Sequence, residues 1–557
     1  MQRGVNKKWF FACALVLLIV GVVAYGTTSP STFGHSAGEV NITLPDGRSF
    51  SLQDAVTQGL LGGSGGPGGT TLSLTTGERF LVESVAMSRA TTCLLLKGGD
   101  VACAGYGSQG DLGIGSSAPS QSNYFLLLPI HNVKQIFTGQ YGFCVIYDPV
   151  PNSVTGINKA ACWGTKGVGA LGNGDTLTKY VPTPVNLSSN EQVIDIAMDQ
   201  QEHWGSPSPY SFTCLLMSDR TVKCMGYNGL GQLGVGAGDT TNRYNPSLVV
   251  GVSNVQSLKI GGSTVNGHPD GYACVIVNQT TSPNSNQGIK CWGTNDYGQL
   301  GKGNNLNAHS APLPEFVTGF DFTVERRVKE IALSQSLYAT VCAILGGSQK
   351  GAVQCWGYNG YGQVGNNLLD DYYGSPRPHS LFDGSSADRK AVHIKFGGDS
   401  REFTYACGLA ESGKLVCWGY NGYGQLGLGT NVNAQRMPEY MLNTFGSSPL
   451  QGVKDVAFGG QYQYGSTCVL MQEGTIKCTG DNDNGQLGIG EVGDRNRVST
   501  VFGITSARAV FSGSDSSTTR YLAILADNST RVWGANYYGS HGIGGDGFAV
   551  YVPTKPL

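Results

Sequence analysis

The sequence predicts an all-β fold, a closed β-propeller of four-stranded blades. Glycine accounts for 84 of the 557 residues and charged residues for only 13%, against usual shares of roughly 7% and 25%, which favours a turn-dense β protein. A glycine-rich phrase recurs eight times from about residue 80 to the end, at intervals of 54 to 67 residues. Fourteen of the 15 cysteines form seven neighbouring pairs, one in each of the first seven units.

Each unit has the same order of elements. An apolar alternation, such as residues 453–460 (VKDVAFGG), precedes the first Cys strand, and a turn, a second Cys strand, the phrase and a return stretch follow. This order gives about four short strands per unit, which is typical of a propeller blade. A lone blade cannot bury both faces of its sheet, so the units should stack into a ring. We count eight units, with seven-bladed closure as the alternative, and expect residues 550–552 to supply the last outer strand without help from residues 27–79.

The cysteine spacing predicts disulfides within hairpins. Four pairs are separated by ten positions, with a β-run on each side and a turn between, as in residues 92–103 (TCLLLKGGDVAC). An antiparallel hairpin then places the two cysteines opposite each other, at a separation that a disulfide tolerates. Zinc sites need closer spacing, so no metal is expected. Cys13 is left unpaired, and the seven predicted bridges are Cys93–Cys103, Cys144–Cys162, Cys214–Cys224, Cys274–Cys291, Cys342–Cys355, Cys407–Cys417 and Cys468–Cys478.

The phrase reads CWGTNDYGQLG at residues 291–301, CWGYNGYGQVG at 355–365 and CWGYNGYGQLG at 417–427. It resembles the repeat of the regulator of chromosome condensation family, whose mark is Trp-Gly-x-Asn-x-x-Gly-Gln-Leu-Gly-x-Gly. The family resemblance implies a propeller, usually of seven blades. The chain departs from the pattern: the family's His before the first Cys strand is missing, and unit 8 has Ala523 and Val532 where the other units have cysteines. Trp precedes the first Gly in only five units, at Trp163, Trp292, Trp356, Trp418 and Trp533.

The phrase is interpreted as structural. No Lys-Ser or Lys-Thr and no helix follow it, as a phosphate-binding loop would need, whereas Gly and Asn provide the positive φ values of tight turns. Its Trp is expected to fill the gap between blades. The eight His are scattered, and no metal, cofactor or catalytic motif is found, so a non-enzymatic protein is predicted. A net charge of −2 without a basic run argues against nucleic-acid binding.

The amino terminus predicts export. Basic residues up to Lys8 precede an apolar run over residues 9–25, so residues 1–26 are interpreted as a signal anchor or a cleaved signal peptide. Residues 27–79 should form a stalk, with a hairpin around Asp46-Gly47 and a Gly-rich linker, and residues 80–557 the propeller. The expected location is extracellular or lumenal, membrane-tethered through residues 9–25, or secreted if the signal is cleaved. Candidate glycosylation sites are Asn41, Asn186, Asn278 and Asn528.

Two surfaces are candidate binding sites. The turns between the second and third strands are long at residues 145–161, 275–290 and 343–354, and long connections cover 304–327 and 366–391. These lie on one face of a propeller, and loop growth on a rigid fold builds binding surfaces. Alternatively, equivalent tyrosines before the second Gly of the phrase should form an arc for ligand binding or pack on the neighbouring blade. These residues are Tyr297, Tyr361, Tyr423 and Tyr538.

The favoured function is a non-enzymatic interaction module that binds a protein or a glycan through one face of the disc. The family resemblance implies a second possibility, guanine-nucleotide exchange on a small GTPase, but such a partner is cytosolic or nuclear and the export signal and cysteine pairs argue against it. A third possibility, also implied by the resemblance, is inhibition of a secreted enzyme.

Overall fold

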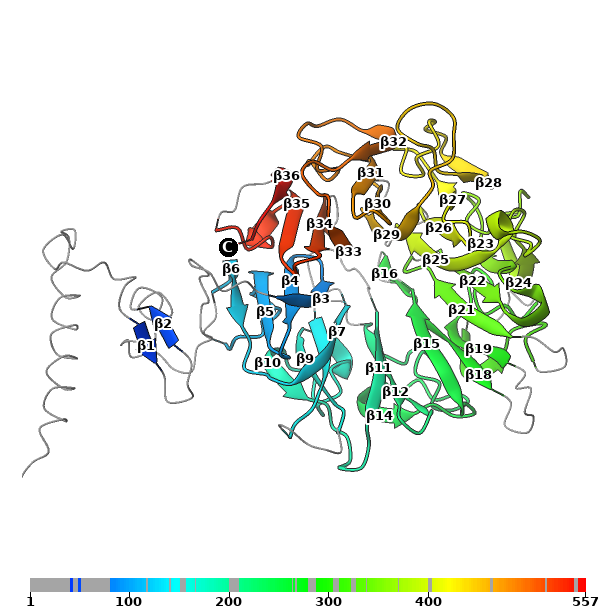
Figure 1. Ribbon diagram of the computed structural model, residues 1–557. Helices are drawn as coiled ribbons and strands as arrows, with labels where there is room; N and C mark the ends of the chain where they lie inside the picture. The colour runs from blue at the N-terminus through cyan, green and yellow to red at the C-terminus, as the bar shows by residue number, and fades with distance from the viewer. Residues whose placement is uncertain are drawn as a thin grey trace, which may run out of the picture.

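The computed structural model describes residues 41–43, 49–51 and 81–556, apart from residues 117–118, 140–141, 151–156, 166, 200–209, 263, 266–267, 279–286, 304–309, 322–326, 337, 369, 399–402, 461–463, 516–517 and 545–548. Eight four-stranded antiparallel sheets form a ring (Figure 1). The prediction of an all-β propeller with eight blades is therefore confirmed, and the seven-bladed alternative is wrong.

Each blade uses four strands from one contiguous unit. Blades 1 to 4 contain β3 (Val82–Met87), β4 (Thr91–Leu96), β5 (Val101–Tyr106), β6 (Gln121–Leu127); β7 (Val133–Gly139), β8 (Gly142–Tyr147), β9 (Lys159–Gly164), β10 (Lys179–Pro184); β11 (Val193–Met198), β12 (Phe212–Met217), β13 (Val222–Gly226), β14 (Arg243–Leu248); and β15 (Val255–Gly261), β18 (Tyr272–Asn278), β19 (Gln287–Thr294), β20 (Ser310–Phe316).

Blades 5 to 8 contain β21 (Val328–Leu333), β22 (Thr340–Leu345), β23 (Val353–Tyr358), β24 (Tyr372–Pro378); β25 (Ala391–Gly397), β26 (Tyr405–Ala410), β27 (Leu415–Tyr420), β28 (Ala434–Tyr440); β29 (Val453–Gly459), β30 (Ser466–Met471), β31 (Ile476–Gly480), β32 (Arg495–Thr500); and β33 (Ala507–Asp515), β34 (Thr518–Leu525), β35 (Thr530–Ala535), β36 (Ala549–Thr554). As expected, β36 supplies the last outer strand from residues near 550.

Short elements lie in the connections. The first connection of blade 4 carries the strands β16 (Thr264–Val265) and β17 (His268–Pro269), and four 3₁₀ turns lie at η1 (Gly167–Gly169), η2 (Gly347–Gln349), η3 (Ala387–Arg389) and η4 (Tyr537–Gly539). Strand alternation in each blade puts the first-to-second and third-to-fourth connections at one end of the disc, which we call the phrase face. The remaining connections form the opposite face, which we call the hairpin face.

The core is divided among the blade interfaces. Each of the eight interfaces contains one cluster of buried apolar side chains from the two blades that meet there. The last cluster joins Leu522 and Val532 of blade 8 to Leu94 and Phe125 of blade 1. The ring therefore closes by the same apolar packing that joins its other blades, as expected when a blade cannot bury its sheet alone.

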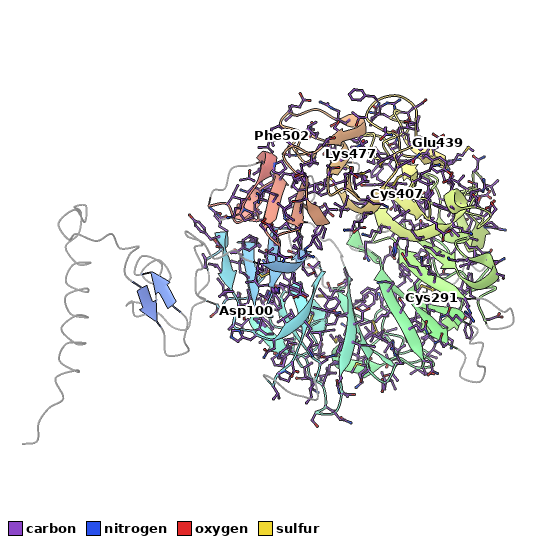
Figure 2. The ribbon with its side chains drawn as sticks, viewed as in Figure 1. Asp100, Cys291, Cys407, Glu439, Lys477 and Phe502 are labelled. Atoms are coloured by element: carbon purple, nitrogen blue, oxygen red, sulfur yellow. A yellow bond between two sulfur atoms is a disulfide. The ribbon has the colours of Figure 1, made fainter. Side chains whose placement is uncertain are left out.

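All seven predicted disulfides are present, each joining directly opposed residues of the second and third strands. Their Cα atoms are 4.1 to 4.2 Å apart. Figure 2 labels Cys291 and Cys407, which belong to two of them. Cys13 lies outside the described residues.

The equivalent position in blade 8 corrects one sequence prediction. Leu522, not Ala523, lies opposite Val532, and Ala523 lies opposite Arg531. A shift of one residue moves a side chain to the other face of a sheet, so Leu522 and Val532 occupy the site that a disulfide fills elsewhere. Both are fully buried.

The amino-terminal region is described only in part. Strands β1 (Asn41–Thr43) and β2 (Ser49–Ser51) pair antiparallel, and the predicted turn at Asp46-Gly47 lies outside the described residues. Residues 9–25, the predicted signal or anchor, lie outside the described residues. Within the residues described, no helix has both the length and the apolar character required to cross a bilayer.

Candidate functional site

The repeated phrase folds into a turn that satisfies its own polar groups. Its Asn side chain accepts a hydrogen bond from the backbone N–H five residues later, at 2.9 to 3.0 Å in six blades. Its Gln side chain accepts from the N–H two residues earlier in five blades, again at 2.8 to 3.0 Å. Asn359 and Gln363, for example, are fully buried. The amide side chains thus hold the loop that the glycines allow to turn.

The phrase also joins consecutive blades. In six interfaces the N–H of its last Gly donates to a carbonyl on the outer strand of the next blade, as from Gly303 to Gly374 at 2.7 Å. The second Gly lies against that strand too, and a Cβ on Gly298 would come within 2.7 Å of Gly374 Cα. Gly298 has φ of +77°, a conformation that glycine adopts without strain. The structural interpretation of the phrase is therefore correct: the phrase packs on the outer strand of the next blade and donates a hydrogen bond to it.

The five blade tryptophans fill the interfaces as expected. Each is fully buried and donates its indole N–H to a carbonyl in the phrase of the preceding blade, at 2.7 to 3.1 Å. Ala104, Met225 and Thr479 take this place in blades 1, 3 and 7. The five indoles lie in five different interfaces, so each one joins a different pair of neighbouring blades.

The predicted tyrosines lie on the phrase face, where they meet the next blade. Tyr297 packs on Tyr338 and Tyr358, with ring centroids 4.7 and 5.6 Å apart. Tyr361 packs on Phe403 and Tyr420 at 5.5 and 5.4 Å.

The same pairing continues in two further interfaces. Tyr423 packs on Tyr464 at 5.3 Å, and Tyr538 packs on Tyr106 at 5.0 Å. Tyr297, Tyr361 and Tyr423 are half-buried, and Tyr538 is 44% exposed. The rings therefore both support the neighbouring blade and leave part of their surface in solvent.

Rings of consecutive interfaces form one feature, which we call the aromatic arc: Tyr297, Tyr338, Tyr358, Tyr361, Phe403, Tyr420, Tyr423 and Tyr464. Five of these eight rings were missed from the sequence. Tyr338, Phe403 and Tyr464 each stand four residues before the first Cys of their blade, and Tyr358 and Tyr420 stand three residues after the second. An aromatic residue recurring at these two offsets was the available signal.

Carboxylates flank both ends of the aromatic arc. Burial and the neighbouring Asp296 raise the pKa of Asp270 to about 8, so Asp270 is largely protonated at neutral pH while Asp296 is exposed. At the other end, burial first and then Tyr464 raise the pKa of Tyr423 to about 12, with Asp481 and Asp494 adding to the effect. The exposed surface of the arc thus lies between acidic groups.

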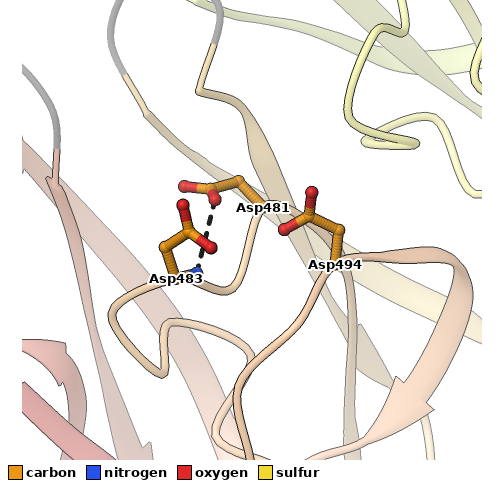
Figure 3. A group of neighbouring side chains, drawn as sticks. All are labelled: Asp481, Asp483 and Asp494. Carbon is orange, nitrogen blue, oxygen red and sulfur yellow. Dashed lines mark hydrogen bonds between the residues drawn. The ribbon is translucent and has the colours of Figure 1, made fainter.

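The acidic group in blade 7 is the densest of these. Figure 3 shows Asp481, Asp483 and Asp494 together, with carboxylate oxygens within 4.8 Å of one another. Burial raises the pKa of Asp481 to about 7. Asp481 accepts hydrogen bonds from Gln486 Nε2 and the Asp483 N–H, and Asp494 accepts from the Asn482 N–H at 3.0 Å. These bonds tie the carboxylates to the phrase, and Asp481 takes the place of the tyrosine found in blades 5 and 6.

Other predicted positions are scattered. Residues 151–156 and 279–286 in the long turns of blades 2 and 4, and residues 304–309 and 322–326 of the connection at 304–327, lie outside the described residues, so the binding role of the enlarged hairpin face stays a prediction. Among the sequons, Asn186 is exposed, with its Nδ2 donating to Asn245 Oδ1 at 2.7 Å, while Asn278 and Asn528 are half-buried. The Asn41 side chain is outside the described set.

Burial lowers the pKa of His379 and His541 to about 3, so both stay neutral in the core.

Comparison with known proteins agrees with this geometry. Models of the regulator of chromosome condensation (RCC1) repeat match residues 291–340, 412–463 and 453–486. The chain carries RCC1 repeats. The plant ultraviolet-B receptor UVR8 of Arabidopsis thaliana is 26% identical over 75% of this chain and 81% of its own length.

Two further matches bear on the fold. The crystal structure of human WBSCR16 matches 75% of this chain and 98% of that chain with a TM-score of 0.51 and 18% identity, which shows the same fold. The human probable E3 ubiquitin-protein ligase HERC4 is 29% identical over 39% of this chain, but the match covers only 18% of HERC4. The RCC1 repeats are thus shared with proteins of different activities.

Proposed function

We propose that this RCC1-repeat propeller is a non-enzymatic protein-interaction module whose binding surface is the aromatic arc. The arc supports this proposal because its half-buried tyrosines are fixed by the next blade yet expose part of each ring. Tyr is enriched at the energetic centres of protein interfaces, since it gives broad contact at little cost in rotamer entropy. The rigid ring would present these groups with little rearrangement.

The charges beside the arc indicate the partner's chemistry. Asp296 at one end and Asp483 and Asp494 at the other are exposed, and aromatic faces attract Arg and Lys through cation–π contacts. We therefore propose a partner that presents a basic segment. Seven disulfides support a site of action in an oxidising compartment, and membrane attachment through residues 9–25 remains part of this proposal.

A defined peptide tests this function. A fluorescent peptide of alternating Arg and Ser should bind the full chain more tightly than an Asp-Ser peptide of equal length, measured by anisotropy. Reversing the exposed charges with Asp296→Lys and Asp483→Lys should weaken binding roughly tenfold, which corresponds to about 1.4 kcal/mol. Tyr361→Ala should weaken it similarly, with a modest loss of stability because the ring also packs on blade 6. Tyr180→Ala removes a tyrosine that is 37% exposed on an outer strand and should change nothing.

Equal binding of the two peptides, or full binding by the charge-reversed variants, would contradict the proposal. A glycan ligand is the second candidate, because exposed tyrosine rings also stack on sugars. Binding to a glycan array that is lost in Tyr361→Ala and kept in Asp296→Lys would favour it.

A further inference from the structure

The ring axis contains a cavity of about 360 Å³. Its walls come from the first strands of blades 1, 2, 6, 7 and 8, which surround the axis in Figure 1, and from the connections that follow the first strands, including Gln335 of blade 5. Small-molecule sites commonly have volumes of about 300 to 1,000 Å³, whereas packing voids rarely exceed a water molecule. The size alone therefore sets this cavity apart from packing defects.

One part of the wall is aromatic. Phe396 and Phe458 occupy equivalent positions in β25 and β29 and are half-buried, and Ile136 and Phe511 also line the cavity. At the same level, Met198 and Ile260 of blades 3 and 4 are at most 6% exposed. The apolar side chains nearest the axis are therefore buried in blades 3 and 4, whereas the phenylalanine rings in blades 6 and 7 are partly exposed.

Another part of the wall is polar and positive. Ser88, Arg89, Ser512 and Ser514 line it at the junction of blades 8 and 1, and Arg89 is the only ionisable side chain among the described residues that line the cavity. Arg520 lies directly behind: its guanidinium donates to the carbonyls of Ser88 and Arg89, and a Cβ on Gly513 would lie 3.1 Å from its Nη2. Two guanidinium groups therefore lie at this end of the cavity.

We propose that the axial cavity is a binding site for a small anionic amphiphile, an aromatic or branched apolar body carrying one carboxylate or sulfonate. The body would lie against Phe396 and Phe458, and the anion would lie toward Arg89. The wall described contains no carboxylate that would repel it. This inference does not depend on the aromatic arc or on a protein partner.

A matched pair of fluorescent probes tests the site. The anion 8-anilinonaphthalene-1-sulfonate should bind the folded chain with one saturable site, and the neutral N-phenyl-1-naphthylamine should bind about tenfold more weakly. Arg89→Gln should weaken the sulfonate about tenfold and leave the neutral probe unchanged. Phe458→Ser, which copies Ser512 of blade 8, should weaken both probes.

Two further variants separate this site from binding to the surface or to unfolded chain. Ser512→Trp should fill the cavity and abolish binding of both probes. Phe502→Ser, which removes a ring that is 67% exposed at the rim (Figure 2), should leave binding unchanged. Binding that does not saturate, that survives both Arg89→Gln and Phe458→Ser, or that falls in Phe502→Ser would overturn the proposal. Melting curves of each variant show whether a loss reflects the cavity or unfolding, and Arg89→Gln tests the anion site even if Ser512→Trp fails to fold.

Discussion

The interface between blades 5 and 6 and the seam between blades 8 and 1 are held in different ways. At the first, Trp418 is buried and bonded to the Gln363 carbonyl at 2.7 Å, and both blades have a disulfide. At the seam, blade 1 has Ala104 in place of Trp, the Phe125 ring fills the space beside Gly542, and blade 8 has no disulfide.

A buried arginine takes over at the seam. Arg520 is 4% exposed and donates to the carbonyls of Ser88, Arg89 and Thr91 and to Thr92 Oγ1. Its equivalents in blades 4 and 6 are Tyr272 and Tyr405, whose hydroxyls donate across their own interfaces at 3.3 and 2.9 Å. Each disulfide lies within one blade, so these bridges stiffen blades but do not join them. Closure of the ring depends on non-covalent contacts.

The largest effect is expected from Arg520→Ala. It removes a cation and leaves buried carbonyls at the seam without a donor, which should cost about 3 kcal/mol or more. Urea unfolding under oxidising conditions measures the loss. Tyr272→Phe is the matched control: it removes one hydroxyl donor at the equivalent place and should cost about 1 kcal/mol. Equal losses in the two variants would show that the seam has no special dependence on its arginine.

An eighth disulfide, introduced into blade 8, should increase the free energy of unfolding. Leu522→Cys with Val532→Cys places two cysteines opposite each other, ten positions apart as in four native pairs. Chain entropy favours the closed loop by about 3 kcal/mol, and the lost apolar burial of Leu and Val offsets about half of that. A gain of about 1 to 2 kcal/mol that disappears with reductant is expected. The pair Ala523→Cys with Val532→Cys should form no bridge, since the two residues are not opposed; a bridge there would show that the register is wrong.

A smaller effect on stability is expected from pH, through two buried aspartates that lie away from the seam. The pKa values of Asp270 and Asp481 are raised to about 8 and about 7 by burial, whereas an unfolded Asp titrates near 4. Between these values the folded state holds two carboxyl protons that the unfolded state has released. Below about pH 6.5 the unfolded state binds protons on His379 and His541, which stay neutral in the folded state, and this opposes the effect of the aspartates. Stability should therefore fall mainly as pH rises from about 6.5 to about 8. The melting temperature should be roughly a few degrees lower at pH 8 than at pH 6.5. Asp270→Asn should reduce this slope and Arg520→Ala should keep it; a flat profile in the unmodified chain would contradict the assignment.

Repetition made much of this fold predictable. Seven cysteine pairs, five tryptophans and eight phrases each recur at matching positions, so a single pattern predicted blade count, bridges and interface fillers together. Departures from the repeat were not predictable in the same way. Arg520 reads as an ordinary strand residue, and only the register shows it facing blade 1. Leu522 was misaligned by one position because unit 8 has no cysteine to mark the strand.

The candidate sites depend on contacts between units. The tyrosines of the phrase were visible in the sequence, but their partners Tyr338 and Phe403 come from the following unit, and their half-burial follows from that packing. The axial cavity combines side chains from five blades at least, such as Arg89 and Phe458, which lie more than 360 positions apart in the chain. No local pattern carries this information.

Each blade is formed by one contiguous stretch of chain, and β36 belongs to the sheet of blade 8 and not to that of blade 1. The first and last blades are neighbours, and η4 of blade 8 contacts β5 and β6 of blade 1. The place where the polypeptide begins is therefore arbitrary with respect to the ring: joining the two ends and cutting another blade boundary would give a circular permutant with the same contacts. Because each blade is one contiguous unit, such a ring gains a blade when a whole unit is duplicated and loses a blade when a whole unit is deleted.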